Sequence, residues 1–281
     1  MSAKFLTWEE AVAWLVAQPD KQDLVRDCYY DPEPEIAAKR YWQSAEWQAI
    51  RAFIPTVPGY ALDLGAGRGI ASYALAKEGW RVAALEPDPS EFVGGGAIRQ
   101  VAQSENLPIE VVQEFGERIP LDAALFDLVI ARQALHHAQD LPALCAEVFR
   151  VLKPGGKFIA VRDHVISSPG DLPAFFRIHP LHELYGGENA LQVSQYRNAM
   201  HAAGFHVEKV LRSFDSVINY APYTRESLRE EFQRRLGRLP LGGVAGRLLN
   251  VDAILDVTLV LLSRVDRRPG RLYSFICSKP Q

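Results

Sequence analysis

The chain has 281 residues, of which 48% are hydrophobic and 23% charged, and its 31 basic and 34 acidic residues give a formal net charge of -3. These values are ordinary for a globular protein with a sizeable core, and the balanced charge favours neither a nucleic acid nor a membrane as partner. The three cysteines form no Cys-x-x-Cys pair, and acidic residues stand near the N-terminus, where a signal peptide needs an apolar segment. We therefore expect a cytoplasmic protein.

The N-terminal part predicts two helices, at residues 8–17 and 35–53, and the prolines and glycine of "IPTVPGY" end the second. Strands and helices then alternate. The predicted strands are residues 60–64, 80–87, 109–113, 126–131 and 157–165, and the predicted helices between them are 70–79, 93–106 and 141–152. A turn, "KPGG", precedes the fifth strand. This alternation favours a mostly parallel sheet with helices on both faces.

Beyond the fifth strand the pattern loosens. Residues 164–190 are expected to be a loop-rich insertion, followed by a helix (191–204), a strand (205–211), two helical stretches (about 224–237 and 241–264) and a last strand (271–278). A long excursion before the last strand indicates an antiparallel end to the sheet. The expected fold is a Rossmann-like, doubly wound, seven-stranded α/β sheet with helical cover insertions.

Four units follow from this pattern. They are an N-terminal helical segment (1–55), a core (56–213 with 270–281), the insertion within it (164–190) and a helical insertion before the last strand (214–269). The most apolar run, residues 248–265, is interrupted by Asp252 and Asp256 and falls short of the ~20 apolar residues of a membrane span. It predicts an amphipathic helix and no membrane contact.

The first strand enters the loop "LDLGAGRG", where Gly65, Gly67 and Gly69 are spaced G-x-G-x-G. A dinucleotide fingerprint has a third glycine where this chain has Ile70, so the spacing disfavours NAD without excluding it. Asp63, two residues before the first glycine, would repel a pyrophosphate. It suits a phosphate-free, cationic ligand such as S-adenosylmethionine.

Five segments in this order, "LDLGAGRG", "ALEPD", "ERIPLDAALFDLV", "RQALHH" and "RVLKPGG", cover roughly residues 60–160. In these segments the chain resembles the class I S-adenosylmethionine-dependent methyltransferases, specifically the small-molecule type related to the quinone-biosynthesis methyltransferases. The cofactor-binding residues that this resemblance implies are Asp63, Gly65, Ala66, Gly67, Gly69, Glu86, Pro87, Phe115, Gly116, Glu117, Ala131 and Gln133.

The resemblance also implies their roles. The glycines let the backbone approach the methionine portion, Asp63 steadies its ammonium, and Glu86 accepts hydrogen bonds from the ribose hydroxyls. Pro87 packs on adenine, and the last two positions lie beside the transferring methyl. The chain departs from the family at Phe115, which stands where an acid usually contacts the adenine amino group. That contact then falls to the backbone near Gly116, to stacking by Phe115 or to Glu117.

The acceptor side is expected where histidines follow the fourth and fifth strands. The candidates are His136, His137, His164, His179, His182, Tyr185 and Asn189, among which His137 or His182 is the predicted general base. The spacing His179-x-x-His182 has no clear third ligand, so no metal site is predicted. The N-P-P-Y or D-P-P-Y pattern of enzymes that methylate amide or exocyclic amino nitrogens is absent, because "ARQALHH" occupies its place.

Segments 1–55, 164–190 and 214–269 are expected to form a lid over the acceptor, with aromatic side chains facing it. Those aromatics include Tyr29, Tyr30, Tyr41, Trp42, Tyr185, Tyr220 and Tyr223. Arginines between residues 225 and 238 alternate with glutamates, which indicates a salt-bridged solvent face more than an RNA site.

The predicted function is methyl transfer by in-line displacement to a small-molecule acceptor, with no nucleic-acid or membrane partner. Two alternatives remain open. One is a non-catalytic S-adenosylmethionine-binding or scaffold protein, and the other, less favoured, is an NAD-dependent oxidoreductase.

Overall fold

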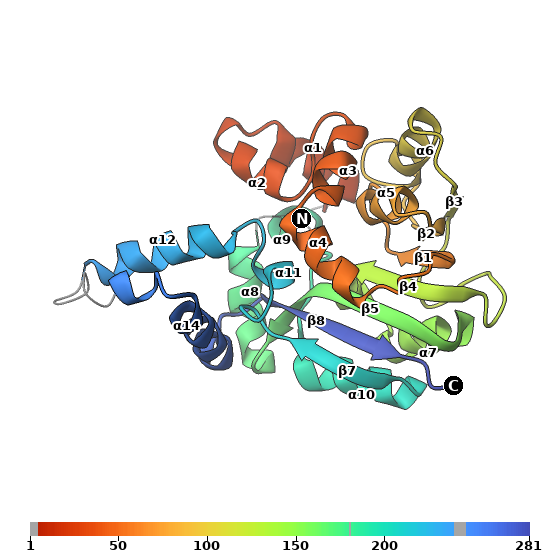
Figure 1. Cartoon of the computed structure of the whole chain (residues 1–281). Helices are drawn as coiled ribbons and strands as arrows, with labels where there is room; N and C mark the ends of the chain where they lie inside the picture. Colours follow the sequence, from red (N-terminus) through yellow and green to blue (C-terminus); the bar gives the residue numbers. More distant parts are fainter. Residues whose placement is uncertain (1–4, 180, 239–245) are drawn as a thin grey trace.

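The computed structural model describes residues 5–179, 181–238 and 246–281, in which a twisted sheet has helices on both faces (Figure 1). Its strands are β1 (Tyr60–Leu64), β2 (Arg81–Leu85), β3 (Ile109–Val112), β4 (Phe126–Arg132), β5 (Leu152–Ile166), β6 (Leu191–Gln192), β7 (His206–Leu211) and β8 (Arg271–Ser278). They lie in the order β3-β2-β1-β4-β5-β8-β7, with β6 beside β5. β8 runs antiparallel to both of its neighbours, β5 and β7, whereas the other described strand pairs are parallel. The Rossmann-like prediction is confirmed, and the two-residue β6 is an addition to it.

Two helical layers cover the sheet, because successive side chains of each strand point to opposite faces. Leu62 and Phe158 face α7 (Leu141–Val151) and α10 (Val193–Ala203), while the neighbouring Ala61 and Ile159 face the other layer. That second layer contains α3 (Pro34–Trp42), α4 (Ala45–Ile50) and α5 (Ile70–Lys77), and α6 (Gly95–Ser104) lies against α3 and β3. The sheet is therefore buried on both sides along its centre.

The N-terminal prediction needs two corrections. The stretch expected as one helix, 35–53, is divided into α3, α4 and a short 3₁₀ turn (Arg51–Phe53). Ser44 causes the break, since its side chain accepts a hydrogen bond from the backbone N–H of Trp47 and so begins a new helix. The structure also has α2 (Gln22–Asp27), which the sequence did not predict, after α1 (Trp8–Val16).

Two further expectations differ from the structure. The insertion expected to be loop-rich contains two short helices, α8 (Leu172–Ile178) and α9 (His182–Tyr185). The "KPGG" turn lies within β5, where the pairing with β4 jumps from Phe126–Leu152 to Leu128–Lys157. The four residues of the expected turn thus form an irregular extension of the strand.

Between β7 and β8 the chain forms α11 (Val217–Tyr220), α12 (Arg225–Leu236) and α14 (Asp252–Val265), and the last two project from the sheet as an arm (Figure 1). The predicted helix 241–264 is seen as α14, and residues 241–245 lie outside the described residues. Arg229 pairs with Asp252 at 2.5 Å and Arg235 with Glu231 at 2.5 Å. The arginines named are thus salt-bridged, as predicted. No helix in the described ranges is long and apolar enough to span a membrane.

Candidate active site

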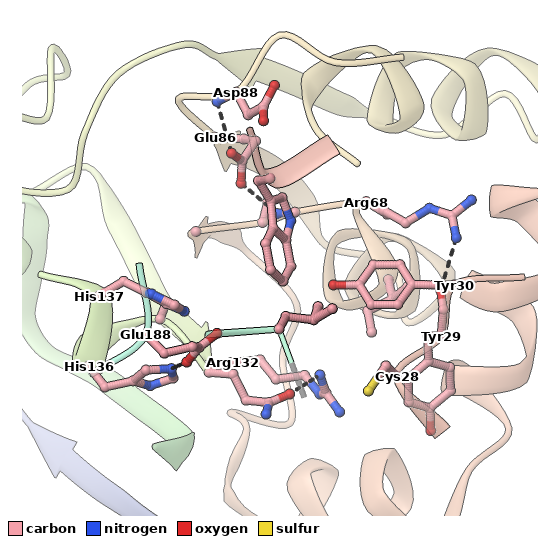
Figure 2. A pocket seen from close by; sticks show the side chains of 18 of the residues that line it. Cys28, Tyr29, Tyr30, Arg68, Glu86, Asp88, Arg132, His136, His137 and Glu188 are labelled. Carbon is pink, nitrogen blue, oxygen red and sulfur yellow. Dashed lines mark hydrogen bonds and ion pairs between the residues drawn. The ribbon is translucent and has the colours of Figure 1, made fainter. Parts of the chain in front are cut away.

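A cavity of about 530 Å³ opens at the carboxyl ends of β1, β2 and β4, where the strand order reverses. In open α/β sheets this is the place where ligands bind, and the volume is typical of a small-molecule site. Figure 2 shows Glu86 on one side of the cavity and His136, His137 and Glu188 on another. The cavity therefore joins the predicted cofactor loop to the predicted acceptor side.

The glycine loop needs its glycines for two different reasons. Gly65, Gly67 and Gly69 all have positive φ, at 66°, 53° and 79°. A Cβ on Gly65 would come within 2.8 Å of Ala134 Cβ, and one on Gly69 within 3.1 Å of Ile98, whereas one on Gly67 would meet nothing within 4 Å. Gly65 and Gly69 thus permit close packing, and the space beside Gly67 is left open.

Glu86 follows β2 and lies against the glycine loop. Its carboxylate accepts hydrogen bonds from the backbone N–H groups of Gly67, at 2.7 Å, and Asp88, at 2.9 Å. Burial raises the pKa of Glu86 to about 7, against these two hydrogen bonds. The two backbone donors do not fully compensate the burial of this carboxylate, and the hydroxyls of a diol could add further donors.

Asp63 lies on β1 and also lines the cavity. Its Oδ2 accepts a hydrogen bond of 2.6 Å from the hydroxyl of Ser72. Burial raises the pKa of Asp63 to about 6, more than the bond to Ser72 lowers it. A cationic group bound nearby would favour its charged form. Pro87 and Ala66 line the same cavity.

The segment after β3 contributes less than the resemblance implied. Phe115 lines the cavity while remaining 56% exposed. Gly116 and Glu117 are not among the described residues that line it. Gly116 packs against Leu64 and Leu144, and the Glu117 carboxylate accepts hydrogen bonds from the backbone N–H groups that precede α7.

The end of β4 places its two predicted residues differently. Ala131 is fully buried within the sheet and is absent from the described cavity wall. Gln133 lines the cavity at a φ of 52°, and its side-chain oxygen accepts a hydrogen bond of 2.8 Å from Arg132. The backbone turn at Gln133 brings the following histidines to the cavity.

Five of the seven acceptor-side candidates line the cavity: His136, His137, His164, His179 and Tyr185. His136 Nδ1 lies 2.9 Å from Asp163 Oδ1. Burial lowers the pKa of His136, but the carboxylates of Asp163 and Glu188 outweigh it and raise the pKa to about 9. His136 is therefore a cation between two carboxylates at neutral pH.

His137 has the opposite protonation. His137 is exposed on the cavity wall, yet desolvation by the surrounding protein, together with the charge of His136, lowers its pKa to about 4. Its Nδ1 lies 3.2 Å from the carbonyl oxygen of Gly187, which can only accept, so Nδ1 carries the proton. The Nε2 lone pair of His137 is then available to a group in the cavity.

His182, the other predicted base, is not among the described residues that line the cavity. Its ring stacks on Phe176 with the centroids 3.9 Å apart and the planes within 4°. His182 begins α9, and its ring points toward Phe176 of α8, where the stacking contact partly buries the imidazole. His137 is the candidate that the geometry retains.

The expected lid is formed in part. Trp8 of α1, Tyr185 of α9 and the segment directly after α2, with Cys28, Tyr29 and Tyr30, line the cavity. Tyr41 belongs to the core beneath α3. No described residue of 214–269 lines the cavity, because α12 and α14 project away from it.

Sequence reasoning missed three charged residues of the site, Asp163, Glu188 and Arg132. Arg132 begins the segment "RQALHH", but none of the three lies near its partner in the sequence. The carboxylate of Glu188 is buried, and the neighbouring His136 brings its pKa below the usual range although burial alone raises it. The signal for Glu188 is its burial among the histidines, and burial cannot be read from the sequence.

Residues 62–160 match the family model described as a methyltransferase domain. The chain is 31% identical to the sarcosine/dimethylglycine N-methyltransferase of Halorhodospira halochloris over 181 residues. These residues cover 64% of this chain and 62% of the relative. It is 35% identical to the ubiquinone biosynthesis O-methyltransferase of Methylobacterium nodulans over 103 residues. These residues cover 35% of this chain and 39% of the relative. The chain thus spans less than two thirds of the length of both relatives.

Solved structures show the same fold. Geranyl diphosphate C-methyltransferase from Streptomyces coelicolor has a TM-score of 0.58 at 13% identity, over 83% of this chain and 74% of that one. The [4+2]-cyclase SpnF has a TM-score of 0.55 at 18% identity, over 87% and 81%. Residues 62–160 therefore form the core of a methyltransferase domain, and the resemblance to the class I S-adenosylmethionine-dependent methyltransferases is confirmed.

Proposed function

We propose that the protein transfers the methyl group of S-adenosylmethionine to a small-molecule acceptor bound beside His137. The observation that carries the proposal is the single cavity that joins the glycine loop and Glu86 to the histidines. The relatives named above, a sarcosine/dimethylglycine N-methyltransferase and a ubiquinone biosynthesis O-methyltransferase, support a small-molecule acceptor.

The cavity wall fits the cofactor that we propose. The open space beside Gly67 admits the methionine portion, with the ammonium near Asp63 and the sulfonium near Gln133. The two buried carboxylates, Asp63 and Glu86, favour a ligand that brings a positive charge and hydroxyl donors. Pro87 and Phe115 are left to enclose the adenine. A pyrophosphate would meet the charge of Asp63, which disfavours NAD.

His137 is the proposed proton acceptor. Methyl transfer requires the acceptor atom to line up behind the methyl carbon, and a base is needed only where that atom carries a proton. His137 is neutral at pH 7 and has a free Nε2, so it can take this proton. The other residues of the wall exclude water and orient the two ligands.

Calorimetry with S-adenosylmethionine tests the cofactor assignment. We expect Glu86→Ala to weaken binding at least ~10-fold, because two charge-assisted hydrogen bonds to the ribose are lost. Glu110→Gln is the matched control, since Glu110 is exposed on β3, pairs with the exposed Arg81 and does not line the cavity. Unchanged affinity in Glu86→Ala, or displacement of the ligand by NAD, would remove the assignment.

Turnover separates an enzyme from a non-catalytic binder. The protein is incubated with isotopically methyl-labelled donor and a metabolite extract, and labelled products are identified by mass spectrometry. We expect a labelled product and S-adenosylhomocysteine in equal amounts, both reduced in His137→Asn. Binding without any turnover above a no-protein control would favour the scaffold alternative.

A further inference from the structure

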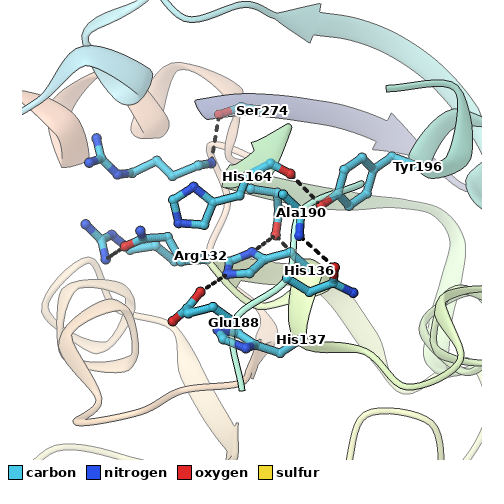
Figure 3. Close-up of polar contacts among 12 residues, drawn as sticks. Arg132, His136, His137, His164, Glu188, Ala190, Tyr196 and Ser274 are labelled. Atoms are coloured by element: carbon cyan, nitrogen blue, oxygen red, sulfur yellow. Dashed lines mark hydrogen bonds and ion pairs between the residues drawn. The ribbon is translucent and has the colours of Figure 1, made fainter. Parts of the chain in front are cut away.

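Three side chains from separate segments converge at the acceptor end of the cavity. His136, His164 and Glu188 each offer one ligand atom, and these atoms lie within 4.8 Å of one another. His136 follows β4, His164 is on β5, and Glu188 lies between α9 and β6 (Figure 3). All three line the cavity.

The two imidazoles are oriented by groups behind them. His136 Nδ1 lies 2.9 Å from Asp163 Oδ1, and His164 Nδ1 lies 2.8 Å from the carbonyl oxygen of Gly270. Since both partners are acceptors, each Nδ1 carries a proton when the ring is neutral, and each Nε2 then has a free lone pair. Metal-binding histidines are held in this way by a carboxylate or a backbone carbonyl.

Glu188 supplies a second, independent observation. Its side chain is only 4% exposed, and Oε1 accepts a hydrogen bond of 2.5 Å from the hydroxyl of Tyr185. Oε2 is buried without a hydrogen-bond partner in the described chain, at 3.7 Å from His136 Nε2. A buried carboxylate oxygen that accepts no hydrogen bond is rare in proteins, and a metal ion that replaces the Nε2 proton of His136 would coordinate this oxygen directly.

We propose that His136, His164 and Glu188 bind a divalent first-row transition metal ion. Two imidazoles and one carboxylate are the ligands of many zinc and non-haem iron sites, and three protein ligands leave a position open to the cavity. Ligand distances of about 2.0–2.2 Å would bring the three atoms to roughly 3–3.5 Å from one another. The side chains therefore have to close by about 1 Å when the ion binds.

This proposal differs from the sequence-based expectation that the chain has no metal site. That expectation considered His179 and His182, which are close in the sequence; in the structure His179 lines the cavity, whereas the His182 ring stacks on Phe176. His179 instead faces Glu188 from another side, with its Nε2 3.6 Å from Oε1. The proposed ligands are 28 and 24 residues apart along the chain, so no spacing motif reveals them.

The role of the ion rests on the proposed function, whereas its binding does not. An acceptor hydroxyl that fills the open position becomes more acidic, and its proton passes to His137. The oxygen then forms a bond to the methyl carbon, the carbon–sulfur bond breaks, and its electron pair stays on sulfur. The products are a methyl ether and S-adenosylhomocysteine. The acceptor class is thus an alcohol or phenol.

Metal binding is measured on the full chain without a polyhistidine tag, after treatment with a chelator and removal of the chelator. We expect calorimetric titration with Zn²⁺ to give one ion per chain with a Kd of about 10 µM or tighter. His164→Gln and Glu188→Gln should each weaken binding at least ~10-fold, and Asp163→Asn should do so by ~10–100-fold through His136. His201→Gln is the matched control, because His201 is exposed on α10.

Folding and cofactor binding are followed in the same variants, by thermal unfolding and by calorimetry with S-adenosylmethionine. Should a variant fail to fold, the wild-type spectrum with Co²⁺ decides, because a site of four or five ligands has intense visible bands and hydrated Co²⁺ has weak ones. Weak bands, or Zn²⁺ affinity unchanged in the His164→Gln/Glu188→Gln double variant, would overturn the site. Zn²⁺ binding without cofactor binding would instead overturn the proposed function alone.

Discussion

Arg132 and Glu46 form a buried, bidentate ion pair. Nε and one terminal nitrogen of Arg132 donate to the two carboxylate oxygens of Glu46, at 2.7 and 3.1 Å. Their side chains are 11% and 1% exposed. Burial raises the pKa of Glu46, but the charges of Arg132 and Arg162 outweigh it and lower the pKa. The pair fastens α4 to the end of β4, beside the cavity.

Replacing Glu46 leaves Arg132 buried without its counter-charge. We expect Glu46→Ala to lower the free energy of unfolding by about 3–5 kcal/mol, measured by urea denaturation. Glu110→Gln breaks an exposed pair with Arg81 and should cost less than about 1 kcal/mol. Equal, small losses in the two variants would show that Arg132 is stabilised by other groups.

The affinity for S-adenosylmethionine should depend on pH through two carboxylates. Burial raises the pKa of Glu86 to about 7 and that of Asp63 to about 6. Both take up protons as the pH falls, and the charges that would bind the ribose and the ammonium are then lost. We expect a loss of about 10-fold or more between about pH 8 and pH 5.5. Calorimetry on Glu86→Gln should give weaker binding and a flatter pH profile, whereas Glu110→Gln should keep the wild-type profile.

The burial of Glu86 should also destabilise the cofactor-free protein at high pH. Because the pKa of Glu86 is raised on folding, the folded state holds the proton over a range in which the unfolded state has released it. Stability therefore falls as the pH rises from about 4.5 to 7, and stays lower above that. We expect Glu86→Gln to be more stable than the wild type by roughly 1–3 kcal/mol at pH 8 and similar at pH 4.5. Urea denaturation at both pH values, without cofactor, checks this.

The raised pKa of His136 predicts a separate loss of stability at mildly alkaline pH. Its pKa is raised on folding to about 9, as Asp163 and Glu188 outweigh the effect of burial. Its contribution is complete below the unfolded pKa of about 6.5 and is lost as the pH rises through 9. We expect unfolding free energies measured in a chelator to fall by roughly 1–3 kcal/mol between pH 7 and pH 9.5. His136→Asn should show a smaller slope, and an identical slope would contradict the ion pairs.

Two glycine substitutions should separate packing from ligand binding. Gly67→Ala strains a positive φ without a clash, so we expect a cost of about 1–2 kcal/mol in stability and a greater loss of cofactor affinity. Gly65→Ala adds a 2.8 Å approach to Ala134 and should destabilise the fold more. Thermal unfolding and calorimetry on both variants measure the two effects, and equal cofactor affinity in Gly67→Ala and the wild type would contradict an approach of the ligand at this loop.

The sequence by itself was sufficient for the sheet and for the cofactor loop. Alternating apolar strands and amphipathic helices predict the layers, because the side-chain period of each element depends only on local geometry. A positive φ in a tight strand-to-helix turn favours glycine, so the spacing of Gly65, Gly67 and Gly69 identified the loop from the sequence. Glu86 was visible because it follows the next strand at a short distance.

The acceptor end was decided by the tertiary structure. The sequence offered several histidines of equal standing, and only packing turned His182 onto Phe176 and His137 toward the cavity. His136, Asp163 and Glu188 come from three segments, and their protonation depends on burial and on charges that only folding brings together. Local patterns specify elements, whereas the electrostatics of a buried cluster depend on through-space distances that sequence spacing does not encode.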